Sequence, residues 1–240
     1  MLYGRMRMTK DNARIDAIVF DADGVLFNTE PLHMRAWENV LAAQGVRYDE
    51  RFYLGWVGVP DEELAVYLTA RHGPCADPSG YLEAKRAAVK DLVRRELAPF
   101  PGVTEALERF AGRVPLAVAT SSPRALLDLM LEKTGLARFF DVTLAYNDVA
   151  RSKPDPQIFE LAVARLGANP ERTAALEDSP TGVRAARAAG LLTVGVTSSF
   201  PAEELDGCAA TFPTTAEACD WVAQRARLSA AAPAPLKENT

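Results

Sequence analysis

Short, β-branched apolar runs that alternate with helical stretches are the feature that most restricts what this chain can fold into. The first run, residues 15–20 (IDAIVF), ends at Asp21 and Gly24, as a buried parallel strand does where it enters a loop. Similar runs follow at residues 115–120, 141–145, 173–177 and 192–196. Apolar residues at helical spacing fill the intervals, for example at 123–134 and 156–166. The alternation predicts an α/β fold with a doubly wound parallel sheet, a Rossmann-like core.

One interval interrupts this alternation. Residues 31–112 carry helical periodicity without a convincing strand, which predicts an inserted helical domain. Its helices are expected at residues 32–44, 61–71 and 81–97, joined by connections at 47–60 and 72–79. We therefore expect a catalytic core of residues 15–30 and 100–225, a helical cap domain of residues 31–99, and tails at 1–14 and 228–240.

Charge and cysteine content narrow the class of partner. The 240 residues have a formal net charge of -5, so the sequence indicates no basic surface that would bind nucleic-acid phosphates or anionic lipid. No run approaches the roughly 18 apolar residues that a membrane span needs. Cys75, Cys208 and Cys219 are odd in number and widely spaced, which indicates neither a disulfide framework nor a zinc site. We expect a cytoplasmic monomer or small homo-oligomer that acts on a small molecule.

Four groups of polar side chains stand directly after apolar runs or in the loops beyond them. They are Asp21 with Asp23 in DADG, Thr120 with Ser121 and Ser122 in ATSS, Lys153 in RSKPDP, and Glu177 with Asp178 in LEDS. In a doubly wound sheet, ligands bind beyond the carboxyl ends of the strands. We therefore expect these groups to converge on one crevice.

The chemistry of this set points to phosphoryl transfer. Several carboxylates in one crevice would repel one another unless a hard cation lay among them, and Mg²⁺ prefers such oxygen ligands. Lys153 and Thr120 would then stabilise the charge on a phosphoryl group in transit. Asp21 is the candidate nucleophile, giving an aspartyl-phosphate intermediate, and Asp23 is the candidate acid and base.

FDADGVLFNTE, AVATSS, SKPDP and LEDS, in that order, resemble the four motifs of the haloacid dehalogenase superfamily, over Ile15 to about Val196. The resemblance implies Asp23 also as a main-chain metal ligand, and Glu177 and Asp178 on Mg²⁺ with Asp21. The dehalogenases of this superfamily lack the second aspartate, so Asp23 points to phosphoryl chemistry. The helical insertion looks like the cap of the subfamily that contains β-phosphoglucomutase and phosphoglycolate phosphatase.

Further candidates for substrate binding have a structural interpretation beside the functional one. They are Thr29, His33, Lys85, Ser121, Ser122 and Arg124. His33 matches a histidine of β-phosphoglucomutases, although an exposed helical histidine fits the position as well. Lys85 and Arg86 lie in a charged stretch that is typical of a solvated helix face. Arg124 can reach a substrate phosphate or flank a helix start.

The sequence thus predicts a phosphatase of a small phosphorylated metabolite, a sugar phosphate. The alternatives are a β-phosphoglucomutase-type mutase and a non-catalytic binding protein with the same fold. A mutase needs a cation on the cap for the distal phosphate, and β-phosphoglucomutases have an arginine shortly after a Gly-Val pair. Here Gly58 and Val59 are followed by Pro60 and Asp61. A carboxylate at that position would repel the phosphate, which favours the phosphatase. Arg124 or Lys85 could supply the missing cation from elsewhere, so the mutase stays open as an alternative.

Overall fold

The computed structural model describes residues 14–46, 52, 56, 61–72 and 78–228. It divides into two compact units: the second unit is residues 28–97, and the first unit is the rest of the described chain. Both predicted tails, apart from Arg14 and Leu228, lie outside the described residues, as do Cys75 and residues 57–60.

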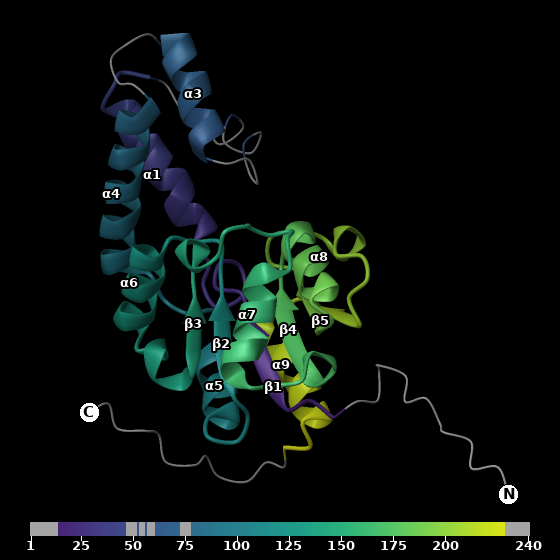
Figure 1. The fold of residues 1–240 in the computed structure, drawn as a ribbon. Coiled ribbons are helices and arrows are strands. Elements are labelled where there is room, and N and C mark those ends of the chain that lie inside the picture. Colours follow the sequence, from purple (N-terminus) through teal and green to yellow (C-terminus); the bar gives the residue numbers. More distant parts are fainter. Residues whose placement is uncertain (1–13, 47–51, 53–55, 57–60, 73–77, 229–240) are drawn as a thin grey trace, which may run out of the picture. The chain divides into compact units, whose positions relative to one another are not determined.

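The first unit is built on one parallel sheet of six strands (Figure 1). The strands are β1 (Ala17–Phe20), β2 (Leu116–Ala119), β3 (Val142–Leu144), β4 (Thr173–Glu177), β5 (Leu192–Val196) and β6 (Ala210–Phe212). Their order is β3-β2-β1-β4-β5-β6, and each neighbouring pair is parallel. In register, Val19 of β1 stands between Ala117 of β2 and Ala175 of β4. The predicted doubly wound sheet is confirmed, with its reversal of strand order at β1.

Helices cover both faces of this sheet, which explains why every residue of β1, β2, β4 and β5 is buried. The helices are α5 (Val103–Phe110), α6 (Arg124–Thr134), α7 (Gln157–Leu166), α8 (Pro180–Ala188) and α9 (Thr215–Arg225). Side chains of α7 and α8, including Phe159 and Ala185, pack with Val19 and Ala117 in one buried cluster. Helix α9 packs on β4, β5 and β6, and also against α5. Because water is excluded from both faces, the strands show no alternation of polar and apolar residues.

Short 3₁₀ helices complete the connections of the first unit. They are η2 (Leu136–Phe139), η3 (Tyr146–Asp148), η4 (Pro170–Arg172) and η5 (Ala202–Glu204). The edge strand β6 was not predicted from the sequence. Its three residues, Ala210, Thr211 and Phe212, are half-buried or exposed, so they form no apolar run. The strand exists because β5 offers it a parallel partner, and a pattern along one segment does not report that pairing.

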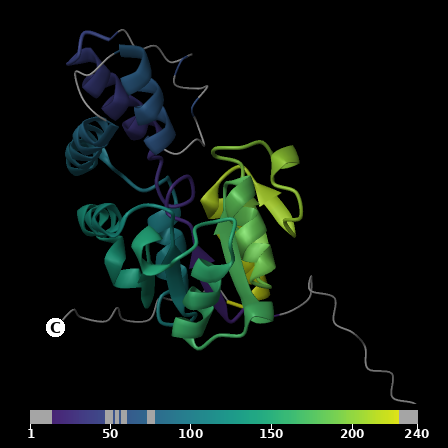
Figure 2. The ribbon, with the colours of Figure 1, turned by 45° about the horizontal axis from the view of Figure 1, so that its top comes forward.

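The second unit contains α1 (Glu30–Ala42), α3 (Asp61–His72) and α4 (Pro78–Glu96). Helix α4 contacts both α1 and α3, and Figure 2 shows the three together, in purple to blue. Both α1 and α4 begin earlier than predicted, because Pro31 and Pro78 stand in their first turns. The fixed φ of proline suits that position, where no backbone donor is needed. The core of the unit centres on Trp37, Leu68 and Tyr81.

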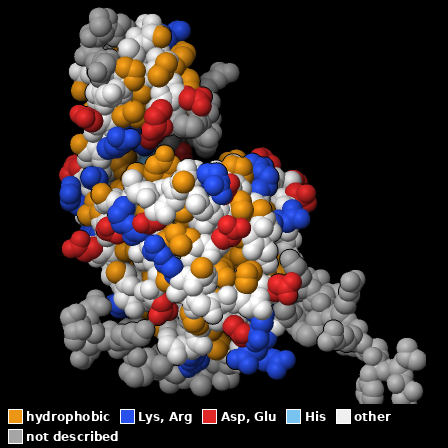
Figure 3. All heavy atoms as spheres, in the orientation of Figure 1, with side chains coloured by type: hydrophobic (Ala, Val, Ile, Leu, Met, Phe, Trp, Pro, Cys, Tyr) orange, Lys and Arg blue, Asp and Glu red, His pale blue; other side chains and the backbone are white. Residues whose placement is uncertain are grey.

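The surface agrees with the charge balance of the sequence. Among the described residues, no helix has both the length and the apolar content that crossing a membrane requires. On the face shown in Figure 3, acidic and basic side chains are interspersed over the first unit. Such a mixed surface differs from the continuous basic stripe that nucleic-acid binding favours.

Candidate active site

The carboxyl ends of β2, β1 and β4 bring the predicted groups together. Asp21 follows β1, Thr120 follows β2, and Glu177 is the last residue of β4. Because β1 lies between the other two strands, their carboxyl ends meet at the point where the strand order reverses. Lys153 reaches the same place from the loop between η3 and α7.

Lys153 is the centre of a buried ionic cluster. Its Nζ lies 2.5 Å from Asp21 Oδ1 and 2.5 Å from Glu177 Oε1, and it donates to the Ala119 carbonyl at 2.9 Å. The Lys153 side chain is 5% exposed, that of Asp21 8% and that of Glu177 1%. Burial lowers the pKa of Lys153, but the two carboxylates outweigh it and raise the pKa above its usual value. The ammonium charge is therefore permanent, and it holds the Asp21 carboxylate in place.

Glu177 is fully buried. Its Oε2 accepts from the Asp178 amide at 3.2 Å and from the Ser179 hydroxyl at 3.3 Å. Gly182, in the first turn of α8, packs against the Glu177 carboxylate. A Cβ on Gly182 would stand 2.1 Å from the Glu177 carboxylate atoms. Only a glycine in this turn leaves room for the charge that positions Lys153. The role of Gly182 was not predicted from the sequence, because it depends on a contact between two elements.

Replacing Gly182 with Ala is expected to disturb this cluster. An alanine in a helix interior ordinarily stabilises by about 1 kcal/mol over glycine. Here the added methyl group would displace the Glu177 carboxylate, so we expect the melting temperature to fall by several degrees, an overpacking loss of about 1–3 kcal/mol. Scanning calorimetry measures the change, and Arg184→Ala, at an exposed position of the same helix, is the control. A Gly182→Ala protein that melts higher than the wild type would contradict this packing.

Asp23 is held by two hydroxyl groups from the loop after β2. Its Oδ2 accepts from Thr120 Oγ1 at 2.9 Å and from Ser122 Oγ at 2.8 Å. The Ser122 amide in turn donates to Thr120 Oγ1 at 3.0 Å, so the hydroxyl of Thr120 already donates and accepts. Ser121, the third hydroxyl of the motif, is exposed. Asp23 and a phosphoryl group would therefore compete for the same donors.

Asp178 lies against the loop that follows β1. A Cβ on Gly24 would meet Asp178 Oδ2 at 1.7 Å, and Gly24 has a φ of 76°, a conformation that favours glycine. Burial, and then the charge of Glu177, raise the pKa of Asp178 to about 7, although a hydrogen bond from Ser199 opposes the shift. Ser199 was missed in the sequence, yet it belongs to a polar group, Thr197 to Ser199, that directly follows β5. The criterion used for the other groups, polar side chains directly after an apolar strand, also applies to Ser199.

The donor set fits a hard cation. The cluster has four carboxylates, Asp21, Asp23, Glu177 and Asp178, against the single ammonium of Lys153. Burial raises the pKa of Asp21, and the charge of Lys153 only partly offsets this shift. Such uncompensated oxygen donors are stabilised by Mg²⁺. Within the described part of the chain, however, no three acidic, histidine or cysteine side chains already surround one point. The reason is that Lys153 lies between Asp21 and Glu177, while Asp23 faces Thr120 and Ser122.

A profile of the haloacid dehalogenase-like hydrolase family matches residues 15–190, which is most of the chain. The chain belongs to this family. The resemblance seen in the four motifs is thereby confirmed.

Two of the relatives are named as phosphatases. The chain is 33% identical over 183 residues to fructose-1-phosphate phosphatase YqaB of Escherichia coli (strain K12), covering 76% of this chain and 97% of that protein. It is 35% identical over 182 residues to a phosphorylated carbohydrates phosphatase of Thermotoga maritima, covering 74% of this chain and 82% of the relative. Among solved structures, a beta-phosphoglucomutase-like protein from Thermotoga maritima aligns with a TM-score of 0.78 and 32% identity, over 88% of this chain and 99% of that one. This member of the haloacid dehalogenase-like family is a phosphatase.

Arg124 has its partners within the first unit. Its guanidinium donates to the Thr143 carbonyl at 2.8 Å and to Asp128 at 3.1 Å, and it pairs with Asp148. These contacts tie the start of α6 to β3 and the turn after it. Of the two interpretations from the sequence, flanking the helix start is the one that this geometry favours.

The cap candidates lie in the second unit, where Lys85 and His33 belong to a part-buried polar cluster. Lys85 Nζ lies 2.7 Å from His33 Nδ1 and 2.5 Å from Asp61 Oδ2, and the Trp37 indole donates to Asp61 at 3.0 Å. Lys85 is 3% exposed, so its assignment to a solvated face was wrong. Thr29, at the start of α1, is also buried.

Arg86 and Asp61 lie in the same unit as Lys85 but differ from it in their surroundings. Arg86 is exposed and lies 3.6 Å from Glu62, as on a solvated face. Burial alone would raise the pKa of Asp61, but the charge and hydrogen bond of Lys85 lower it below its ordinary value. Because the charge of Lys85 neutralises that of Asp61, Asp61 would not repel the distal phosphate of a mutase intermediate. The argument against a mutase from this repulsion therefore no longer holds. The preceding residues, Gly58 to Pro60, lie outside the described part of the chain.

Proposed function

We propose that this phosphatase hydrolyses a small phosphorylated carbohydrate, that it requires Mg²⁺, and that Asp21 becomes transiently phosphorylated. The observation that carries the proposal is the fixed position of the Asp21 carboxylate, held by Lys153 beside the hydroxyls of Thr120 and Ser122 and beside Asp23. The names of the relatives support the substrate class, since two of them act on fructose 1-phosphate or on phosphorylated carbohydrates.

In the proposed first step, an Asp21 oxygen attacks phosphorus while the bond to the leaving oxygen breaks. Lys153, and the hydroxyls of Thr120 and Ser122, would stabilise the negative charge of the phosphoryl oxygens. Because Asp23 now accepts from those two hydroxyls, an arriving phosphoryl group would displace its carboxylate. The freed Asp23 could then give a proton to the leaving oxygen and later take one from the attacking water. Water attack at phosphorus releases inorganic phosphate and restores Asp21.

Asp21, Asp178 and the main-chain oxygen of Asp23 would hold the magnesium ion. Bound there, it would neutralise carboxylate and phosphate charge and orient the substrate. Glu177, whose oxygens have partners in Lys153, Asp178 and Ser179, would contribute its charge rather than an oxygen ligand.

The stability of the metal-free protein is expected to fall as pH rises. Asp178 has a folded-state pKa of about 7, against an ordinary value of 3.8, so the folded state retains a proton that the unfolded state releases. The stability that this proton contributes is lost as the pH rises from 3.8 to about 7. We expect the melting temperature in EDTA to be lower at pH 8 than at pH 5 by about 5 °C.

Two further measurements complete this test. Mg²⁺ should raise the melting temperature more at pH 8, where the carboxylates are ionised, and Asp178→Asn should reduce both the pH dependence and the response to Mg²⁺. Asp220→Asn, at an exposed position of α9, should behave as the wild type. A metal-free protein that becomes more stable between pH 5 and pH 8, with Asp178→Asn unchanged from it, would remove Asp178 from the proposed site.

A panel of sugar phosphates, assayed for phosphate release with Mg²⁺ or with EDTA, tests the function. We expect release with Mg²⁺ and little in EDTA. The mutase alternative predicts conversion of β-glucose 1-phosphate to glucose 6-phosphate, primed with the bisphosphate, without matching phosphate release. A binding protein without catalysis predicts neither product. Efficient conversion without release would overturn the proposal in favour of the mutase.

A further inference from the structure

The turn after β5 brings two hydroxyl groups to the catalytic edge of the sheet. It consists of Thr197, Ser198 and Ser199, and it follows the strand next to β4, which ends at Glu177. The Thr197 amide donates to the Phe212 carbonyl of β6 at 2.9 Å, and the Thr197 hydroxyl donates to the same oxygen at 3.4 Å. The edge strand β6 therefore anchors this turn.

Ser198 holds the loop that carries Asp23. Its hydroxyl donates to the carbonyl of Gly24, which is 174 residues away in the sequence. Thr215, the first residue of α9, donates to the next carbonyl, that of Val25, at 2.5 Å. The two carbonyl groups that directly follow Asp23 thus have hydroxyl partners outside the loop.

The same loop also has hydrogen bonds of its own. The Gly24 amide donates to the Phe27 carbonyl at 2.8 Å, and the amides of Leu26 and Phe27 donate to the Ala22 carbonyl at 2.9 Å and 3.0 Å. These bonds set the shape of the loop. The contacts from Ser198 and Thr215 fix its position relative to the rest of the first unit.

Ser199 contacts both segments that hold the proposed metal ligands. Its hydroxyl donates a hydrogen bond to the Asp178 carboxylate. A Cβ on Gly24 would stand 2.8 Å from Ser199 Oγ and 1.7 Å from Asp178 Oδ2, so the three residues lie against one another. A hydroxyl in this position limits the orientations that the Asp178 carboxylate can adopt.

A purely structural account would treat both serines as ordinary turn residues. Serine hydroxyls in turns commonly bond to the backbone a few residues away, whereas these two bond to other segments. Both serines are exposed, and water is an equally good partner for an exposed hydroxyl, so the bonds contribute little to stability. What they share is contact with the segments that carry Asp23 and Asp178.

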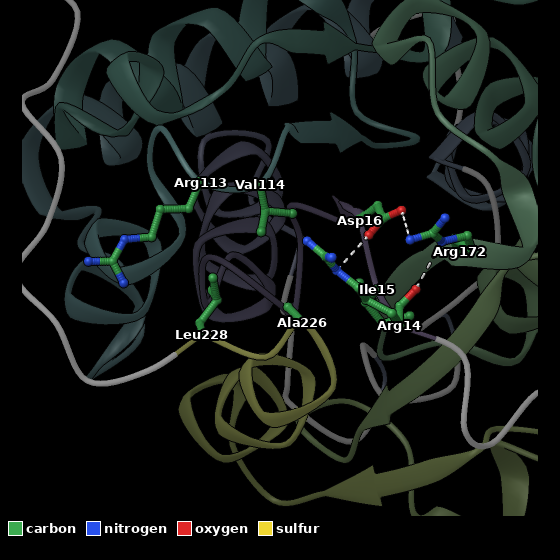
Figure 4. A pocket seen from close by; sticks show the side chains of 8 residues that line it. All are labelled: Arg14, Ile15, Asp16, Arg113, Val114, Arg172, Ala226 and Leu228. Atoms are coloured by element: carbon green, nitrogen blue, oxygen red, sulfur yellow. Dashed lines mark hydrogen bonds and ion pairs between the residues drawn. The ribbon is translucent and has the colours of Figure 1, made fainter.

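The opposite, amino edge of the sheet provides a contrast (Figure 4). Asp16, just before β1, pairs with both Arg14 and Arg172, and Arg172 Nε donates to the Arg14 carbonyl at 3.4 Å. These residues lie at the ends of β1 and β4 that are far from Asp21 and Glu177. Their contacts join the strands to one another and do not reach the candidate active site.

We propose that Ser198 and Ser199 are positioning residues for the magnesium site, an inference that rests on the proposed function. Ser199 would orient the Asp178 carboxylate, and Ser198 would fix the main chain at Asp23 and Gly24. Together they would set the spacing between a carboxylate ligand and a main-chain ligand that follow different strands. Loss of a partner that orients a metal ligand typically lowers metal affinity by about tenfold to a hundredfold.

Titration of the full-length, metal-free protein with MgCl₂ at pH 8, followed by two-dimensional amide NMR, tests the role of Ser199. The amide signals of Gly24 and Asp178 report on binding. Ser199→Ala should raise the Mg²⁺ dissociation constant by about tenfold, while the melting temperature without metal stays within about 3 °C of the wild type. Ser199→Thr, which keeps the hydroxyl, should restore most of the affinity. Ser79→Ala, the same change at an exposed position of α4, should bind Mg²⁺ as the wild type does.

Amide hydrogen exchange in EDTA tests the role of Ser198 without the metal. Ser198→Ala should speed exchange at Gly24, Leu26 and Phe27 by about fivefold, because the loop loses a contact that fixes its position. Exchange at the amides of β1, which are bonded within the sheet, should stay as in the wild type.

The outcomes separate this proposal from the proposed function. If the wild type binds Mg²⁺ and Ser199→Ala binds it equally tightly, the positioning role is overturned and the proposed function stands. Binding by Ser199→Thr that is as weak as that by Ser199→Ala, or unaltered exchange in Ser198→Ala, would also contradict the proposal. A wild type whose signals do not respond to Mg²⁺ would overturn the metal requirement itself, and the positioning role with it.

Discussion

Asp21→Asn is expected to lower kcat by at least about a thousandfold while the protein stays folded, because the variant loses its nucleophile and little else. The amide nearly preserves the shape of the carboxyl group, and Lys153 retains Glu177 at 2.5 Å and the Ala119 carbonyl at 2.9 Å. Burial raises the pKa of Asp21, which means that its charged form is costly inside the folded protein. A neutral side chain avoids this cost, so we expect a melting temperature close to that of the wild type.

Steady-state kinetics and calorimetry on one preparation measure both effects. Asp220→Asn makes the same chemical change at an exposed position of α9 and should leave kcat unchanged. An Asp21→Asn protein that is folded and turns over at a rate comparable to the wild type would exclude Asp21 as the nucleophile.

Lys153→Met is expected to be the most destabilising substitution in the site. It leaves Asp21 and Glu177 buried without the ammonium that now lies 2.5 Å from each. Removing one partner of a buried ion pair typically costs about 3–5 kcal/mol. For a chain of this size that corresponds to a fall in melting temperature of about 10 °C. Methionine keeps much of the volume of the side chain, so the loss reports mainly on charge.

The pH dependence of this loss identifies its cause. Burial already raises the pKa of Asp21 and the charge of Lys153 opposes that shift, so without Lys153 the Asp21 carboxyl holds its proton more strongly in the folded state, and the stability that this proton contributes is lost as pH rises. The difference from the wild type should therefore be larger at pH 8 than at pH 5. Lys133→Met, at an exposed position of α6, is the control. A Lys153→Met protein that melts no lower than Lys133→Met would contradict the buried cluster.

The sequence predicted the sheet and the convergence of its motifs because both depend on local patterns. Apolar runs mark the central strands, and a parallel sheet brings the residues at their carboxyl ends together. The position of Asp23 was beyond such reasoning, since its hydrogen bonds to Thr120 and Ser122 depend on side-chain orientation. The roles of Gly24 and Gly182 depend on contacts across elements and were equally hidden.

Lys85 shows a different kind of error, because its burial could have been predicted. Tyr81, Lys85 and Val89 are spaced four residues apart on α4, so they lie on the same helix face, and all three are buried. The charge of the residue was given more weight than its position. A buried lysine is expected to have charged or polar partners, which here are Asp61 and His33.

Chemical trapping of the enzyme during turnover tests the central claim most directly. Borohydride reduces an acyl phosphate on an aspartate to homoserine, which mass spectrometry of peptides can locate. We predict homoserine at Asp21 when the wild type is quenched during hydrolysis of a sugar phosphate with Mg²⁺, and none when substrate is omitted. Homoserine at Asp23 or Asp178 instead, or at no carboxylate in an enzyme that is releasing phosphate, would contradict the account.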